Sequence, residues 1–409
     1  MTDDLAFLIN FMIDKNGAVF IVYATSLATS WCLIRWNPTI REVSSQGVQN
    51  RSVPIDGLRG MLGIGVFCHH IAITWFYLHT RVWELPESHL LIHLGQTSVA
   101  LFFMITAFLF WGRVLDRRGN IIWSQFFVSR LYRLYPIYIV AISIMFFLTT
   151  YLPRLAGTPT DGPIWRPVIK WLLFAVWGAP NFNGFDDTAQ LMAGVVWSLR
   201  YEWLFYLALP LLAWATNGRW RAVGIGIVTL ALIVYAPHLL PTFRTNPMIL
   251  QLFLGGIAAA YVARNPTLVR LAKTPAATLV AISSLLMVGW YLDTAYSFAA
   301  TIGLGIFFSI VACGNDLGGF LSGQALRWLG DITYPIYLLH GLLLVVVFRG
   351  VLTVDQSQNA AWFFALVPII TISLIIVSSA SFVLIERPAI LAGRRHYDAL
   401  KRLGRRVAG

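Results

Sequence analysis

The sequence predicts an all-α protein, a polytopic bundle of transmembrane helices. Hydrophobic residues make up 58% of the 409 residues and charged residues only 12%, whereas a soluble domain is about one quarter charged. Apolar stretches long enough to cross the ~30 Å hydrocarbon core of a bilayer recur along the chain. Lys and Arg gather in alternate connections between these stretches, as in a protein that crosses a membrane repeatedly.

About eleven apolar stretches are expected to span the membrane. The first resembles a signal peptide, but it follows the acidic residues Asp3, Asp4 and Asp14 and lacks a small-residue cleavage site, so we interpret it as a helix. The expected spans are 18–34, 57–79, 96–112, 134–152, 194–216, 221–236, 247–263, 275–292, 297–313, 333–349 and 362–385.

The distribution of positive charge predicts the orientation of the chain. Most of the 30 Lys and Arg residues lie in one set of connections, which includes Arg113, Arg264 and the basic tail 390–409. That set is expected on the cytoplasmic side of the membrane. The N-terminus is then outside, the C-terminus is cytoplasmic, and the protein belongs in the inner (cytoplasmic) membrane.

The segment 153–193 is apolar in part, but it carries Arg166 and Lys170. Counting it as a span would place the basic turn at 219–221 outside, so we interpret it as an external segment with a short interfacial helix. Its Gly, Asn and Asp content is typical of an ordered loop over the mouth of a cavity.

Composition excludes several other classes of protein. The net charge of +12 follows from the basic connections, and the sequence contains no nucleic-acid-binding module. Cys32, Cys68 and Cys313 lie far apart in apolar runs without the spacing of metal ligands, so we expect packing roles and no metal. We therefore look for chemistry among the polar residues inside the spans.

Arg59 and His70 are the first candidates, because ionisable side chains inside a span are costly and are functional candidates by default. They are eleven residues apart, close to three helical turns, so they share one face of the span with a rise of ~16 Å. Neighbouring His69 points about 100° away and is expected to be structural. The alternative for His70 is a simple hydrogen bond to a backbone carbonyl.

Arg130 and Arg133 lie at the inner end of the fourth expected span, and their i, i+3 spacing places them on one face. They could anchor the chain to lipid head groups. Together with Arg59, they would instead suit a phosphate-bearing ligand that arrives from the cytosol.

Glu202 lies ~12 Å into the fifth expected span, at a depth similar to that of His70. An internal ion pair with an Arg is the alternative to a functional role. His340 is also buried in its span, where helix packing is an equally good interpretation.

Six short patterns, in order along residues 54–389, make the chain similar to the acyltransferase-3 family of integral membrane O-acyltransferases. Each pattern is weak alone, and together they are specific. They are 55–60 with His70 (the R-x10-H motif), 102–108, Arg130 to Arg133 before Tyr135 and Pro136 (the R-x-x-R motif), 197–206 (W-S-L-x-x-E-x-x-F-Y), 334–340, and Glu386-Arg387-Pro388.

The resemblance implies three regions. An extra N-terminal helix and cytoplasmic linker occupy 1–53, the acyltransferase domain 54–389, and a basic cytoplasmic tail 390–409. Family members usually have ten spans, often Gly where this chain has Ala107, and commonly Pro where it has Gly341. These departures leave the Arg and His residues untouched.

The resemblance also implies an activity: transfer of an acyl group, commonly acetyl from acetyl-CoA, to a hydroxyl of a cell-envelope carbohydrate such as a polysaccharide or glycolipid. His70 is then the expected general base, with Glu202 orienting its imidazole and Arg59 as a further catalytic group. Arg59, Arg130 and Arg133 are expected to bind the phosphates of acyl-CoA. Trp197, Ser198, Tyr206 and His340 are expected to contact substrate.

Three other functions stay open at this point. Acylation of a small molecule or lipid would use the same residues. A transporter or flippase also carries intramembrane Arg, Glu and His, although no half of the chain repeats the other. A non-catalytic scaffold would leave the charged faces unexplained. The sequence favours the acyltransferase.

Overall fold

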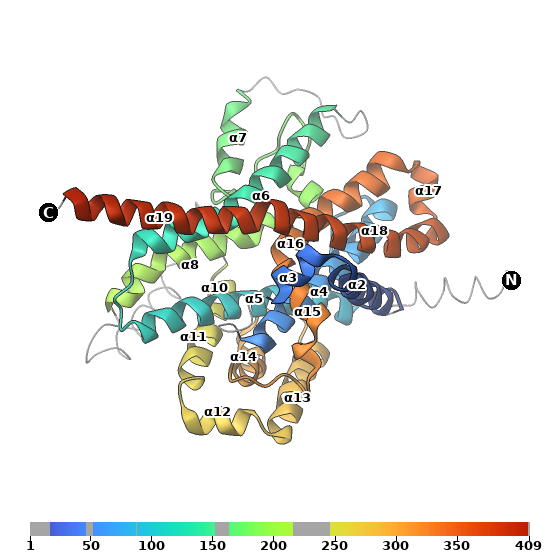
Figure 1. Cartoon of the computed structure of the whole chain (residues 1–409). Coiled ribbons are helices and arrows are strands. Elements are labelled where there is room, and N and C mark those ends of the chain that lie inside the picture. Colours follow the sequence, from blue (N-terminus) through green and yellow to red (C-terminus); the bar gives the residue numbers. More distant parts are fainter. Residues whose placement is uncertain (1–16, 46–51, 87, 152–162, 216–245, 408–409) are drawn as a thin grey trace.

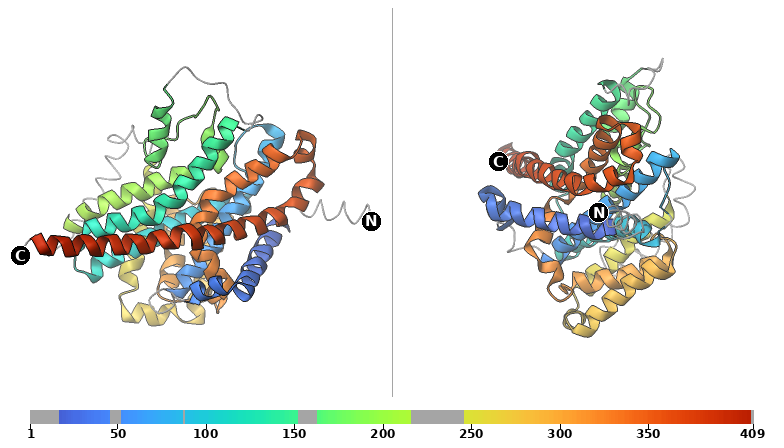
Figure 2. Two further views of the ribbon diagram at one scale, coloured as in Figure 1. Left: turned by 45° about the horizontal axis from the view of Figure 1, so that its top comes forward. Right: turned by 90° about the vertical axis from the view of Figure 1, so that its right-hand side faces the viewer.

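The computed structural model describes residues 17–45, 52–86, 88–151, 163–215 and 246–407. Within these ranges every regular element is a helix and no strand forms, which confirms the predicted all-helical class. The long helices run side by side through the molecule, and shorter helices cover its two ends (Figures 1 and 2).

In the described ranges, six helices are long and apolar enough to cross a membrane. All six fall on predicted spans. They are α2 (Gly17–Trp36), α4 (Val53–Thr80), α5 (His89–Asp116), α6 (Trp123–Tyr151), the helix Thr333–Val351 formed by α16 (Thr333–Val345) and η5 (Val346–Val351), and the helix Ala360–Tyr397, which includes α18 (Ala360–Ser381) and η6 (Phe382–Glu386).

Of the remaining predicted spans, α13 (Pro275–Tyr291) and α14 (Phe298–Ala312) are shorter, one is bent, and α8 (Val196–Ala215), with 20 residues, is not among the six, so the helices do not establish a count of eleven. The pair α10 (Pro247–Leu250) and α11 (Leu252–Val262) bends by 106° into α12 (Pro266–Ala272). The span expected at 221–236 lies outside the described residues.

Two helices extend beyond their predicted boundaries. The chain turns after α5 through Arg118 and Gly119, whose φ angles are 49° and 81°, and α6 then begins at Trp123, well before the predicted start at 134. The basic tail expected after residue 389 is instead part of α19 (Arg387–Val407), which continues α18 through the π-helical turn η6. Figure 1 shows α19 crossing the molecule, and it packs on α6.

Glycines fix the position of α4. A Cβ atom at Gly57 would overlap the carbonyl of Leu321, and one at Gly60 would overlap the carbonyl of Leu326 in α15 (Gln324–Asp331). Small residues let helix backbones approach closely where lipid provides no hydrophobic drive for association. The face of α4 that carries these glycines is therefore held against α15.

The segment after residue 162 forms the expected short helix, α7 (Trp165–Leu172), followed by an ordered loop. Trp171 is fully buried and donates its indole N–H to the carbonyl of Pro180. The loop ends in the short helix η2 (Thr188–Met192), which packs on α16 at Gly341, where a Cβ atom would overlap the backbone of Ala193. The loop thus covers α16 one residue beyond His340.

Candidate active site

A cavity of about 190 Å³ lies between α4, α5, α6, α8 and α16. Each helix contributes polar side chains to its walls, and the aromatic residues of α5 and α16 fill the spaces between them. The polar lining includes Arg59, Thr106, Arg113, Arg130, Arg133, Ser198, Glu202, Tyr206, Thr333, Tyr334 and Tyr337. The sequence predicted Arg59, Arg130, Arg133 and Glu202 as site residues, and the structure brings these four together.

Two of the cavity's arginines lie over one aromatic ring, whereas Arg59 pairs with Asp56, one turn before it on α4, at 3.7 Å. The guanidinium carbons of Arg113 and Arg130 lie 5.4 and 4.9 Å from the centre of the Phe110 ring. The buried Nε of Arg130 has no hydrogen-bond partner. A cation over an aromatic ring is attracted to its face, but its N–H groups still require acceptors. These N–H groups therefore remain available to an anionic ligand.

Glu202 lines the same cavity as the arginines. Its carboxylate accepts hydrogen bonds from Thr106 Oγ1 at 3.3 Å and from Tyr206 OH at 3.1 Å. The sequence interpretation had Glu202 orient the imidazole of His70, and this contact does not form in the structure. The helices α8 and α5 pack together, so Glu202 meets Thr106 of α5 and shares the cavity with Arg130 and Arg133 instead.

His70 pairs with His340, and the two ring nitrogens that face each other, His340 Nε2 and His70 Nδ1, are 3.0 Å apart. The Nδ1 of His70 also lies 3.0 Å from the carbonyl of Val66, and the Nδ1 of His340 lies 2.9 Å from the carbonyl of Ile336. The ring of His70 stacks at 6.4 Å on Trp83, which follows the end of α4.

These contacts define the tautomers of the two neutral rings. A carbonyl oxygen only accepts, so Nδ1 of His340 carries a proton and its Nε2 has a lone pair. His70 faces that lone pair and a second carbonyl with the same nitrogen, so its Nδ1 also carries the proton. The Nε2 of His70 then keeps a lone pair, for which the described part of the chain offers no hydrogen-bond partner, and such a nitrogen suits a general base.

Two helix faces connect the cavity to the histidine pair. Arg59 and His70 share a face of the unbroken helix α4. On α16, Thr333 and Tyr337 line the cavity, and His340 follows Tyr337 by one turn, with ring centres 6.3 Å apart. The helices α4 and α16 pack together, so the histidine pair lies one helical turn beyond the cavity lining.

The other predicted residues divide into two groups. Ser198 and Tyr206 line the cavity, and Ser198 Oγ lies 2.7 Å from Tyr337 OH. Trp197 packs against Phe103 and Tyr201 and does not line the cavity. His69, expected to be structural, is buried with its Nδ1 at 2.7 Å from the carbonyl of Leu91.

Sequence reasoning missed Tyr337, Thr106 and Arg113. Tyr337 could have been found, because it precedes His340 by three residues and so shares its helix face. Arg113 was treated as one of many residues of a basic connection. Thr106 lies within the pattern 102–108, but nothing in the sequence singles it out from its neighbours. Its role became visible only when the structure placed α5 beside α8.

Comparison with known proteins agrees with this geometry. The family model described as an acyltransferase domain matches residues 53–378. The exopolysaccharide production protein ExoZ of Rhizobium meliloti (strain 1021) is 24% identical over 310 residues, covering 74% of this chain and 91% of that protein. No solved structure matches the chain.

Two peptidoglycan O-acetyltransferases are also similar. OatA of Listeria monocytogenes serovar 1/2a (strain ATCC BAA-679 / EGD-e) is 26% identical over 70% of this chain and 48% of its own length. The putative enzyme YrhL of Bacillus subtilis (strain 168) is 24% identical over 85% of this chain and 56% of its own length. The chain thus spans about half the length of these two relatives. Because the family model covers most of the chain, the protein belongs to the acyltransferase-3 family and is a membrane O-acyltransferase.

Proposed function

We propose that this protein transfers an acyl group from acyl-CoA to a hydroxyl of a cell-envelope carbohydrate, and that the acyl group is acetyl. One observation carries the proposal: an arginine-lined cavity ends one helical turn along α16 from a histidine pair, in which the Nε2 of His70 has no hydrogen-bond partner among the described residues. An anionic donor and a proton acceptor are the two groups that such a transfer requires.

The donor end of the site is assigned to the arginines. Arg59, Arg130 and Arg133 present guanidinium groups to one cavity, and guanidinium is well suited to bind phosphate oxygens. With the orientation predicted from the basic connections, the N-terminus is outside, the C-terminus is cytoplasmic, and the arginines face the cytosol, where acyl-CoA is made. The membrane is then the cytoplasmic membrane.

The chemical step is assigned to His70. Its Nε2 takes the proton from the attacking hydroxyl, whose oxygen bonds to the thioester carbonyl carbon. The carbon–sulfur bond then breaks, and the leaving thiolate takes the proton from Nε2. The products are the carbohydrate ester and the free thiol, and His70 returns to its starting state.

His340 is a positioning residue in this scheme. Its Nε2 accepts the Nδ1 proton of His70, and that hydrogen bond becomes charge-assisted when His70 is protonated. The rise of about 16 Å along α4 separates Arg59 from His70 too far for both to contact one carbonyl. We therefore assign Arg59 to donor binding, and Glu202 to the positioning of the arginines beside it.

The acceptor class rests on the names of the relatives. Two similar proteins are named as peptidoglycan O-acetyltransferases and one as an exopolysaccharide production protein. All three names refer to carbohydrate polymers of the cell envelope. A hydroxyl on such a polymer, or on its lipid-linked precursor, is the acceptor that we propose.

The test is acyl transfer by the purified protein in lipid nanodiscs, with radiolabelled acetyl-CoA and envelope saccharides as acceptors. We expect labelled ester in the wild type and a loss of about 10²- to 10⁴-fold in His70→Ala, the range that a general base contributes, with acetyl-CoA binding retained. His79→Ala is the matched control, because His79 lies on the same helix at its exposed end. Near-normal activity of His70→Ala would overturn the proposal.

A further inference from the structure

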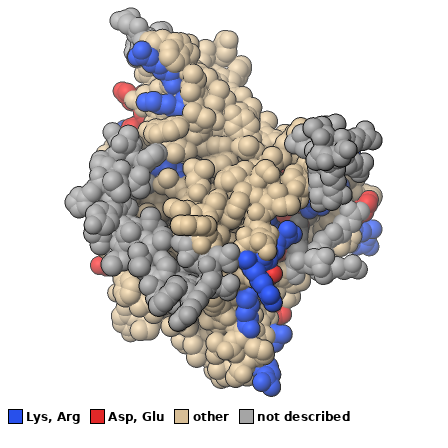
Figure 3. Space-filling model, turned by 90° about the vertical axis from the view of Figure 1, so that its left-hand side faces the viewer, with Lys and Arg blue, Asp and Glu red and all other residues tan. Residues whose placement is uncertain are grey.

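A second cavity of about 460 Å³ adjoins the first and shares Phe110, Arg113, Arg130 and Arg133 with it. We call this cavity the vestibule. Its additional walls are the region between α5 and α6, including Arg117, and one face of α19. Figure 3, which looks onto the side of the molecule at the left of Figure 1, shows more Lys and Arg than Asp and Glu atoms on that surface.

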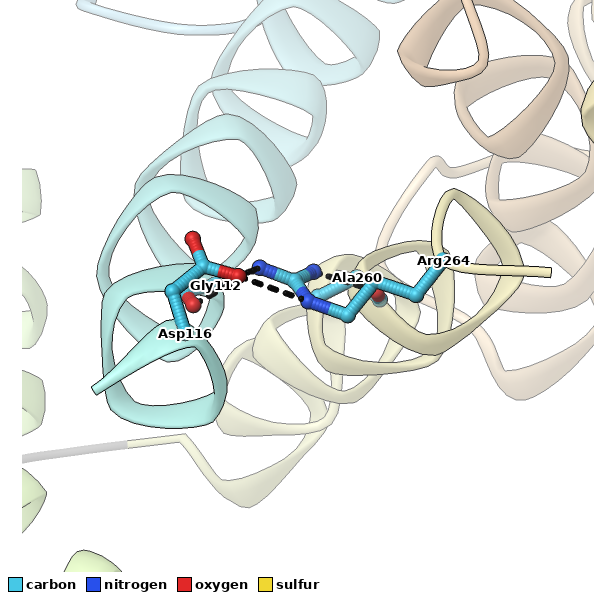
Figure 4. Close-up of polar contacts among 4 residues, drawn as sticks. All are labelled: Gly112, Asp116, Ala260 and Arg264. Carbon is cyan, nitrogen blue, oxygen red and sulfur yellow. Dashed lines mark hydrogen bonds and ion pairs between the residues drawn. The ribbon is translucent and has the colours of Figure 1, made fainter. Parts of the chain in front are cut away.

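Positive charge predominates among the described side chains of the vestibule. Five arginines line it, and no Asp or Glu is among the described residues of its walls. The carboxylate of Asp116, at the end of α5, instead accepts from Arg264 Nε at 3.1 Å and Nη2 at 2.6 Å (Figure 4). Arg264, which follows α11, also donates to the carbonyl of Gly112. Asp116 therefore pairs with Arg264 and not with Arg113 or Arg117.

Helix α19 is held in place where it faces the vestibule. A Cβ atom at Gly393 would lie 2.8 Å from the side chain of Tyr132 on α6, so the backbone of α19 is in close contact with that side chain. The rings of Tyr132 and His396 lie 6.1 Å apart beside this contact. Arg394 and Tyr397, spaced i, i+3, both line the vestibule from the same face of α19.

We propose that α19 is part of the donor site, with Arg394 and Tyr397 binding the adenosine 3′,5′-bisphosphate end of acyl-CoA in the vestibule. This inference rests on the proposed function. Phosphates cluster at that end of the donor, and the guanidinium groups of five arginines suit them. The ring of Tyr397 supplies an apolar face for the base, and the acyl arm extends through the first cavity toward His70.

The experiment compares donors that differ only at the nucleotide end: acetyl-CoA, its 3′-dephospho form and acetyl-pantetheine. We expect Arg394→Gln to raise the KM for acetyl-CoA about threefold to tenfold with kcat unchanged, in the range of one charge-assisted contact that is partly open to water. For acetyl-pantetheine the variant should equal the wild type. Arg395→Gln is the control, because Arg395 is exposed and does not line the vestibule. An unchanged KM, or an equal loss with acetyl-pantetheine, would overturn the inference.

A binding measurement separates this inference from the proposed function. Adenosine 3′,5′-bisphosphate alone should bind the wild type more tightly than Arg394→Gln and Tyr397→Ala. If this difference in binding is seen but no acyl transfer occurs, the assignment of the vestibule to the nucleotide is supported and the proposed function is wrong. Lipid phosphate is the other source of the same chemistry. The contrary result is that Arg394→Gln changes the KM for acetyl-CoA only in nanodiscs with anionic lipid and not in neutral lipid. That result would identify the vestibule as a binding site for lipid head groups and overturn the inference.

Discussion

Replacement of His340 by Ala tests whether the histidine pair sets the tautomer of the base. His340 is fully buried, and its Nε2 accepts the Nδ1 proton of His70. The carbonyl of Val66 remains as a second acceptor, so the variant loses the strength that this hydrogen bond gains when His70 is protonated, about 0.5–1.5 kcal/mol. That corresponds to roughly a twofold to tenfold loss in kcat.

The assay is steady-state acyl transfer in nanodiscs, with kcat and the KM for acetyl-CoA measured separately. His340→Ala should lower kcat and leave KM unchanged, because His340 lies beyond the arginine cavity. His340→Gln should recover part of kcat, since its amide oxygen can accept the same proton. A loss as large as that of His70→Ala, with no recovery in Gln, would show that His340 is the base itself. An unchanged kcat would refute the pairing.

Three further substitutions test the packing. Gly341→Ala should cost about 1–3 kcal/mol of stability by displacing the loop at Ala193, seen as a lower thermal midpoint, whereas Gly289→Ala, with open space around it, should not. Arg264→Gln should lower the thermal midpoint because it removes the ion pair with Asp116. An unchanged thermal midpoint would show that this ion pair does not stabilise the fold. Hydrogen bonds from Ser322 and the Gly319 N–H lower the pKa of Asp316 below 3.8. The ionised carboxylate therefore stabilises the fold fully above 3.8, the ordinary pKa of Asp, and this contribution is lost as the pH falls through the lowered pKa. Asp316→Asn should accordingly be less stable than the wild type at pH 7 and equally stable in strong acid.

The features of the fold that could be predicted from the sequence are those with a local signal. The six long helices follow from apolar windows, and the shared face of Arg59 and His70 follows from the helical repeat. The early start of α6 was missed because Gln125, Arg130 and Arg133 lower the mean hydropathy of that stretch. Arg130 and Arg133 line both cavities and Gln125 lines the vestibule, so the helix carries these polar residues without presenting all of them at its outer surface.

The parts of the site that could not be predicted depend on which helices are neighbours. His70 and His340 are 270 residues apart, and no local pattern brings α4 beside α16. The same applies to Glu202, whose partner Thr106 is brought to it by the packing of α8 on α5. Depth along a helix is a property of the sequence, whereas rotation toward a partner is a property of the assembled bundle.

The contact of Gly57 and Gly60 with the segment 321–330 has a consequence for the distance between donor and base. Arg59 lies between these two glycines, and His70 lies three turns further along the same rigid rod. Whatever shifts the glycine contact moves both groups together and keeps their separation constant. The distance between Arg59, which is proposed to bind the donor, and His70, the proposed base, is therefore set by the number of residues between them in α4. The glycines determine only where α4 packs against the rest of the protein.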